Sequence, residues 1–186
     1  QSQVVGMMES FLLRPKFPDQ LDLVRHLLPF TNGVLDMHQL RIVPGRPEHF
    51  CSKGPNYEWR DWEAGQREVA ELERMLSSMQ PYRCVRDLLM SVCGSLLVKG
   101  QPHKQMYILF GDTNGGKSFI DRVIKTAMGD AYTTISPSVL ASDDDASGHT
   151  EWLMPLRGAS VAGTAEPDAN TRWNASRIKR MVTPFD

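Results

Sequence analysis

The segment Gly111–Ser118, which reads GDTNGGKS, restricts the fold of this chain more than any other feature. It satisfies the pattern G-x-x-x-x-G-K-[ST], in which glycines let backbone N–H groups close around phosphate oxygens. The continuous apolar run Met106–Phe110 precedes it and is typical of a parallel strand buried on both faces. A helical pattern follows from Phe119 to Met128 and ends at Gly129. A strand, this loop and a helix in that order predict a nucleotide-binding site.

The loop predicts ATP and Mg²⁺ as ligands, with a role for each part. We expect Lys117 to reach the β- and γ-phosphates as a catalytic residue, and Ser118 to place its hydroxyl on Mg²⁺. The helix N-terminus adds partial positive charge. The predicted nucleotide-binding residues are those of the whole loop: Gly111, Asp112, Thr113, Asn114, Gly115, Gly116, Lys117 and Ser118. The other interpretation is a glycine-rich turn with a solvated lysine.

The chain before the loop divides into an irregular part and a helical part. Six prolines between Phe11 and Pro55 exclude long helices there. Asn32-Gly33 favours a tight turn, either alone or with short strands at 34–35 and 41–43. From Gln66 onward apolar residues recur at helical spacing, and a second apolar stripe over 85–97 predicts another helix packed in a core.

Composition excludes several other classes of protein. With 186 residues, 41% of them hydrophobic, the chain can form one core and a smaller leading segment. Because Lys+Arg 21 nearly balance Asp+Glu 22, any contact with nucleic acid has to be local. The three cysteines and five histidines lack the spacing of disulfide or metal frameworks. No run approaches the roughly 18 apolar residues of a membrane span. We therefore expect a soluble protein of a reducing, intracellular compartment, with no membrane partner.

Four segments of the chain resemble the superfamily 3 helicases. Within that group they resemble the helicase part of poxvirus-type primase-helicases of large DNA viruses, phages and mobile elements. The segments are LLPFTNGVLDMHQLRIVPGRPEHF, CGSLLVKGQPHKQMYILFGDTNGGKS with its loop residue Asn114, the turn Gly129–Tyr132, and LRGASVAGTAEPDANTRWNASRIKRMVTPFD. The resemblance covers most of the chain.

The resemblance makes Glu166 the Walker B candidate, since in this family a strand ends in Glu and a helix containing Ile-Lys follows. A carboxylate at that end of a strand can hold the Mg²⁺ shell or polarise the attacking water. Glu166 is therefore predicted to be both catalytic and metal-binding. Many members have two adjacent acidic residues where this chain has Ala165-Glu166. Asp168 is either the second carboxylate or an acid of a surface loop.

A basic cluster follows Glu166. Arg177, Lys179 and Arg180 are candidate nucleic-acid contacts, with Trp173 available to stack on a base. The alternative is the solvated face of a helix whose apolar residues, Ile178 among them, pack inward.

The resemblance also implies a ring-forming, hexameric motor that moves along single-stranded or fork DNA, in the cytoplasm or nucleus of a host cell if the protein is viral. The Thr-Gly-Gly-Asp of the family is replaced here by Thr183-Pro184-Phe185-Asp186. We expect this chain to lack the family's primase domain, its DNA-contacting hairpin, its γ-phosphate sensor and its arginine finger.

Together these patterns predict an α/β fold, with an AAA+-type P-loop ATPase core that has a parallel sheet and follows a small α+β module. The predicted boundaries are 1–64 for the entry module with its hairpin, 65–104 for a helical linker and 105–186 for the ATPase core. The predicted activity is ATP hydrolysis coupled to DNA unwinding in viral or mobile-element replication. Two other classes stay open: a non-catalytic ATP-binding fragment that assembles with partners, and a small P-loop phosphotransferase.

Overall fold

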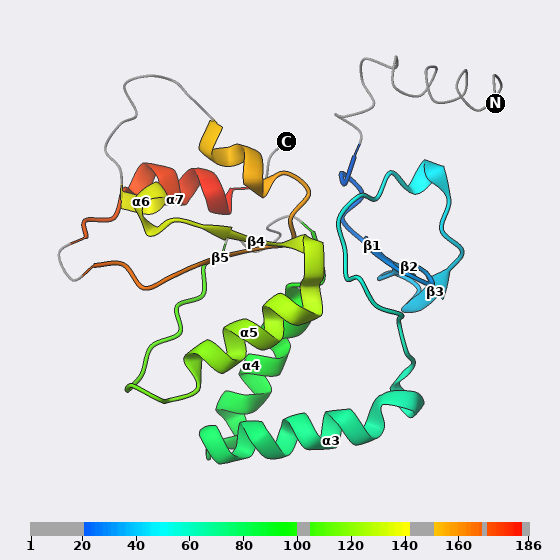
Figure 1. Cartoon of the computed structure of the whole chain (residues 1–186), viewed down its shortest axis with the longest axis horizontal. Helices are drawn as coiled ribbons and strands as arrows, with labels where there is room; N and C mark the ends of the chain where they lie inside the picture. The colour runs from blue at the N-terminus through cyan, green and yellow to red at the C-terminus, as the bar shows by residue number, and fades with distance from the viewer. Residues whose placement is uncertain (1–20, 100–104, 142–150, 169–170, 184–186) are drawn as a thin grey trace.

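The computed structural model describes residues 21–99, 105–141, 151–168 and 171–183, and these form two small sheets and several helices (Figure 1). One sheet is antiparallel with the strand order β1-β2-β3, and the other is a parallel pair, β4 and β5. No helix in these ranges is long and apolar enough to span a membrane. Thr183-Pro184-Phe185-Asp186 stand where the family has Thr-Gly-Gly-Asp. Residues 184–186 of this segment lie outside the described residues.

The antiparallel sheet confirms the predicted hairpin and adds a strand before it. Its strands are β1 (Leu27–Phe30), β2 (Gly33–Asp36) and β3 (Arg41–Val43), and Phe30 pairs with Gly33 across the first turn. A Cβ at Gly33 would lie 2.6 Å from the carbonyl oxygen of Val43, so this position requires glycine. Asn32 does not take the predicted positive φ. Its side-chain amide instead exchanges two 3.0 Å hydrogen bonds with the backbone of Trp59.

Three helices follow, as the apolar periodicity predicted. They are α3 (Trp62–Met79), which begins four residues before Gln66, α4 (Arg83–Ser95), and α5 (Lys117–Met128), which ends at Gly129 with a φ of 51°. The stripe on α4 is less buried than predicted: Leu88 is 64% exposed, and no residue of the helix is fully buried. Of these three helices, α3 and α5 each contribute one buried side chain, Leu76 and Met128 respectively.

The parallel pair confirms that the chain turns into a second strand after Gly129. A short 3-10 turn, η2 (Gly129–Ala131), leads into β4 (Tyr132–Ile135), which pairs in register with β5 (Val161–Thr164). Between and after the strands lie α6 (Pro137–Ala141), η3 (Glu151–Leu156) and α7 (Ala175–Val182), and a further 3-10 turn, η1 (Pro47–His49), follows β3. The helix predicted around Ile178-Lys179 is therefore present as α7.

The strand predicted at Met106–Phe110 is wrong. This segment carries no strand pairing, and Figure 1 shows it as a plain tube outside both sheets. Its five apolar side chains are all exposed, from 44% at Met106 to 97% at Phe110. A strand is stable only when neighbouring strands satisfy its backbone groups, and within the described residues no strand pairs with this one.

The core joins the antiparallel sheet to the end of α5. Leu28, Phe30 and Leu35 of β1 and β2 cluster with Met128 and Ala131. Hydrogen bonds cross the same boundary: the Tyr57 hydroxyl donates to the Ala127 carbonyl at 2.7 Å, and the Asp130 amide donates to the Gly54 carbonyl at 3.1 Å. The mixed α/β class is thus confirmed with a small parallel sheet. The three domain boundaries stay predictions, as does the AAA+-type core.

Candidate functional site

The loop Gly111–Ser118 turns tightly, and its last two residues, Lys117 and Ser118, are the first two residues of α5. Asn114 and Gly116 take left-handed conformations, with φ of 66° and 83°, and the Gly115 amide donates to the Asp112 carbonyl at 3.1 Å. Asparagine and glycine are the residues that adopt this conformation at least cost. The sequence Asn-Gly-Gly thus permits the abrupt change from loop to helix.

Lys117 closes this loop from inside. Its ammonium group donates to the carbonyl oxygens of Gly111 and Asp112, both at 2.7 Å. An ammonium group held against two loop carbonyls can exchange them for phosphate oxygens, because both are hydrogen-bond acceptors. The side chains of Thr113 and Ser118 are exposed and make no hydrogen bond within the described chain.

The start of α5 presents unpaired donors at the same place. The N-cap, Gly116, supplies no side-chain cap, and the first turn-closing hydrogen bond is that of the Ile120 amide to the Gly116 carbonyl at 3.1 Å. The amides of Lys117, Ser118 and Phe119 find no acceptor in the described part of the chain. Three free N–H groups, a helix dipole and an ammonium group together fit a phosphate anion.

The end of α3 supports the loop from behind. A Cβ at Gly116 would lie 2.5 Å from the sulfur of Met79, the last residue of α3. This close approach and the φ of 83° both favour glycine at 116 independently of any ligand. Periodicity indicated that Met79 belongs to a packed helix face, but its contact with the loop depends on tertiary structure.

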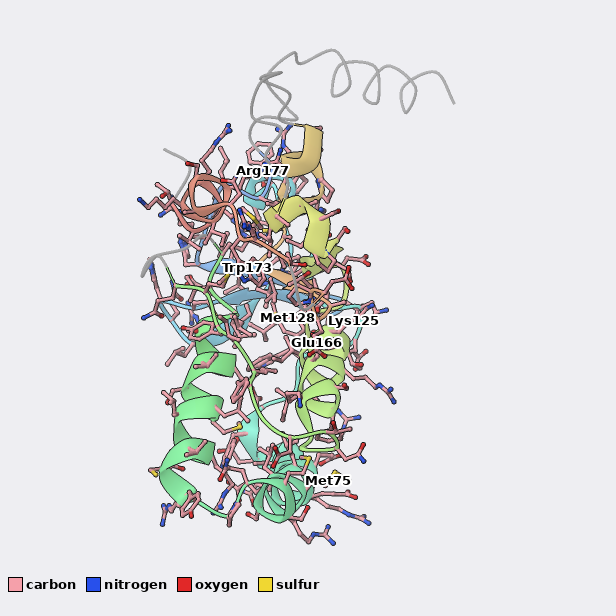
Figure 2. The ribbon with its side chains drawn as sticks, turned by 90° about the vertical axis from the view of Figure 1, so that its left-hand side faces the viewer. Met75, Lys125, Met128, Glu166, Trp173 and Arg177 are labelled. Atoms are coloured by element: carbon pink, nitrogen blue, oxygen red, sulfur yellow. The ribbon has the colours of Figure 1, made fainter. Side chains whose placement is uncertain are left out.

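Glu166 lies two residues beyond the carboxyl end of β5 and is exposed. Figure 1 shows this end of β5 and the start of α5 on the same side of the molecule, at the left of the view. In Figure 2 Glu166 lies at the level of Lys125 and Met128 of α5. Among the described residues its carboxylate makes no hydrogen bond or ion pair, so the structure does not join it to the loop. Asp168 is also exposed.

A tyrosine of β4, the strand that pairs with β5, ties the parallel sheet to helix α5, a contact that sequence reasoning missed. The Tyr132 hydroxyl of β4 donates to the carboxylate of Asp121 on α5 at 2.7 Å, and the Lys125 ammonium lies 5.8 Å from the centre of the Tyr132 ring. Burial, and then the Asp121 carboxylate, raise the pKa of Tyr132. A Cβ on Gly163 of β5 would collide with the tyrosine hydroxyl, so the ring sets how closely β5 approaches.

The basic cluster on α7 divides into a buried and an exposed part. Arg177 is only 6% exposed, and its guanidinium donates to the Val139 carbonyl of α6 at 3.1 Å. Figure 2 shows it farther from α3 than Glu166 is. Lys179 and Arg180 are exposed, as is Trp173 at 44%. The inward face predicted for this helix therefore includes an arginine, and only the other two cations face solvent.

Comparison with known proteins gives several matches. A family model described as "D5 N terminal like" matches residues 1–81. The chain is 29% identical over 188 residues to a "Putative helicase" of Invertebrate iridescent virus 3, covering 100% of this chain and 20% of that protein. It is 24% identical over 166 residues to a "Putative helicase" of Acanthamoeba polyphaga mimivirus, covering 89% and 17%. A "Putative primase" of African swine fever virus is 26% identical over 185 residues, covering 95% and 19%.

These matches support a viral primase-helicase family, which the sequence resemblance also indicated. The chain spans about a fifth of the length of these curated relatives.

Proposed function

We propose that this chain is the nucleotide-binding part of an ATP-dependent DNA helicase motor of the superfamily 3 type, acting in viral DNA replication inside a host cell. The observation that carries the proposal is the loop Gly111–Ser118 with Lys117 held against its carbonyls and three unpaired amides at the start of α5. The names of the relatives support a helicase or primase role.

The residues of the loop would bind the triphosphate of ATP. The ammonium of Lys117 would leave the Gly111 and Asp112 carbonyls for the β- and γ-phosphates, while the amides of Lys117, Ser118 and Phe119 donate to phosphate oxygens. The exposed Ser118 hydroxyl and the Glu166 carboxylate would hold Mg²⁺. When bound, the ion would supply positive charge that offsets the charge of the phosphates.

Glu166 would also orient and deprotonate the attacking water. Its carboxylate has no partner in the described chain, so no existing bond must break before it acts. Tyr132 would be a positioning residue, because it fixes the spacing between α5 and β5.

The exposed Lys179 and Arg180 would contact the phosphates of single-stranded or fork DNA. Arg177 is left out of this contact, because its guanidinium is buried against α6. As in the family it resembles, the motor would assemble as a homo-oligomeric ring, with hexamers as the expected form.

Nucleotide titration of two variants tests the site. We expect Lys117→Ala to abolish Mg²⁺-dependent ATP binding while thermal unfolding stays unchanged, because its ammonium contacts only loop carbonyls. Arg122→Ala, an exposed cation on the same helix, is the matched control and should bind ATP normally. Calorimetric titration measures both. Unchanged affinity in Lys117→Ala would remove this lysine from the site.

Hydrolysis separates the proposed motor from the two other classes. In a polypeptide long enough to turn over ATP, Glu166→Gln should retain binding and lose hydrolysis, because an amide keeps the shape but is not a base. Hydrolysis stimulated by single-stranded DNA, together with self-association, supports the motor. ATP binding without hydrolysis in that longer polypeptide would instead favour an ATP-binding module that assembles with partners. Transfer of phosphate to a small molecule would favour a phosphotransferase.

A further inference from the structure

Three potential metal ligands meet at the base of the β1–β2 hairpin, far from the nucleotide loop in sequence. One ligand atom each from His26, Asp36 and His38 lies within 4.8 Å of the others, and within the described residues this is the group that could hold a metal ion. The two imidazole rings stack, with centroids 4.1 Å apart and planes inclined by 10°. Sequence spacing gave no sign of this group, because the hairpin register brings the two histidines together.

The hairpin holds these side chains on a fixed support. Leu27 pairs with Asp36, and the Met37 amide continues the ladder by donating to the His26 carbonyl at 2.9 Å. Behind the ligands, Leu28 and Leu35 are buried to 0% and 2% exposure. Because the backbone is already ordered, binding a metal ion would cost little further conformational entropy.

Asp36 is itself oriented by the chain. One carboxylate oxygen, Oδ1, accepts from the backbone amides of His38 at 2.9 Å and Gln39 at 3.3 Å. These bonds turn the chain so that His38 returns beside Asp36, and they leave Oδ2 available. The imidazole nitrogens of both histidines make no hydrogen bond within the described chain.

We propose that His26, Asp36 and His38 bind one divalent transition-metal ion, with Zn²⁺ as the expected ion. Two neutral imidazoles and one carboxylate are ligands that suit Zn²⁺, Co²⁺ and Ni²⁺, whereas Mg²⁺ prefers oxygen alone. Bonds of about 2.0–2.2 Å require the ligand atoms to approach one another by side-chain rotations that turn the two imidazole rings out of their parallel stacking. The exposed position of His38 leaves room for its ring to turn.

The surroundings leave the site open rather than closed. Asp36 also lines a cavity of about 380 Å³, together with Arg41, Arg46 and His49. A fourth coordination position facing this cavity would hold water or a small anion, which the two arginines favour. This ion would fix the base of the hairpin, and it is independent of the nucleotide site.

Cobalt substitution tests the proposal on the whole 186-residue chain. The exposed thiol is removed first by Cys84→Ser, so that a thiolate does not compete for the ion. One equivalent of Co²⁺ should then give the visible d–d absorption of a four-coordinate site, without a sulfur charge-transfer band, and Zn²⁺ should displace it. Excess Mg²⁺ should not displace the Co²⁺.

Variants decide which residues bind the ion. We expect His38→Ala and His26→Gln each to weaken Zn²⁺ binding at least tenfold, and both to lose the rise in melting temperature that Zn²⁺ gives the parent. His49→Ala is the matched control, because His49 lines the same cavity without belonging to the group. Lys117→Ala should bind Zn²⁺ normally. Zn²⁺ affinity unaffected by His38→Ala, or lost equally in His49→Ala, would overturn the assignment.

Discussion

At the scale of single residues, one buried ion pair joins parts of the chain that lie far apart in sequence. The side chains of Lys99 and Asp22 are both 3% exposed, and Nζ of Lys99 lies 2.5 Å from Oδ1 of Asp22. The Asp22 carboxylate also accepts hydrogen bonds from the amide and the hydroxyl of Ser52. The Lys53 ammonium next to it donates to the Arg157 carbonyl at 2.7 Å. The pair therefore connects the segment before β1 to the segment after α4, and Lys53 adds a contact to the loop before β5.

This pair predicts a specific loss of stability. Asp22→Ala should cost about 3–5 kcal/mol in the free energy of unfolding, because it leaves the ammonium of Lys99 buried without its partner. Asp61→Ala is the control, since Asp61 is exposed and makes no side-chain cap on α3. Urea unfolding at neutral pH measures both. Equal losses in the two variants would mean that the pair is solvated in solution.

The same pair predicts how stability depends on pH. Burial raises the pKa of Asp22, but hydrogen bonds from Lys99 and Ser52 outweigh it and hold the pKa below its usual 3.8. The Asp22 carboxyl therefore has a lower pKa in the folded chain than in the unfolded chain. Its ionised form stabilises the fold at pH values above the unfolded pKa, and this stabilisation is lost as the pH falls through the folded pKa. The stability difference between the parent and Asp22→Ala should therefore be full at neutral pH and shrink below about pH 4.

At the scale of elements, the segment Met106–Phe110 shows that apolar composition alone does not make a strand. Its hydrophobicity is that of a buried parallel strand, yet its side chains lie in solvent. Helix α5 directly after it forms as predicted, because a helix satisfies its backbone within itself. A strand depends on neighbours, and here β4 and β5 pair only with each other.

Unfolding measurements on two variants test this difference. In the 186-residue chain, Phe110→Ser should change the free energy of unfolding by less than about 0.5 kcal/mol, because Phe110 is 97% exposed. Leu28→Ala, in the fully buried centre of β1, should cost about 2–5 kcal/mol. A large loss in Phe110→Ser would place the segment in a sheet in solution.

At the scale of the whole molecule, we expect ATP binding without appreciable ATP hydrolysis. Transition-state charge on the γ-phosphate is stabilised in many nucleotide hydrolases by an arginine worth on the order of 10³ to 10⁵ in rate. Of the arginines near Glu166, Arg177 is occupied by Val139 of α6. Arg177 could therefore reach the ATP of a neighbouring subunit only if α7 moved away from α6.

We thus predict that the purified 186-residue chain binds ATP but hydrolyses it far more slowly than the ordinary enzyme range of about 1 s⁻¹ or more. Steady-state phosphate release with and without single-stranded DNA measures this, with Lys117→Ala as the blank. Rates in the ordinary range, stimulated by DNA, would show that the 186-residue chain supplies this stabilising charge itself.

The sequence by itself determined the local elements of this protein. The periodicity of α3, α4 and α5, the stop at Gly129 and the loop conformation of Asn114 and Gly116 all depend on neighbours within a few residues, so they could be predicted. The tertiary structure alone decided what is buried. It exposed Phe110, buried Arg177, and brought Asp22 to Lys99 and His26 to His38, because burial and long-range pairing depend on which other segments are there to pack against.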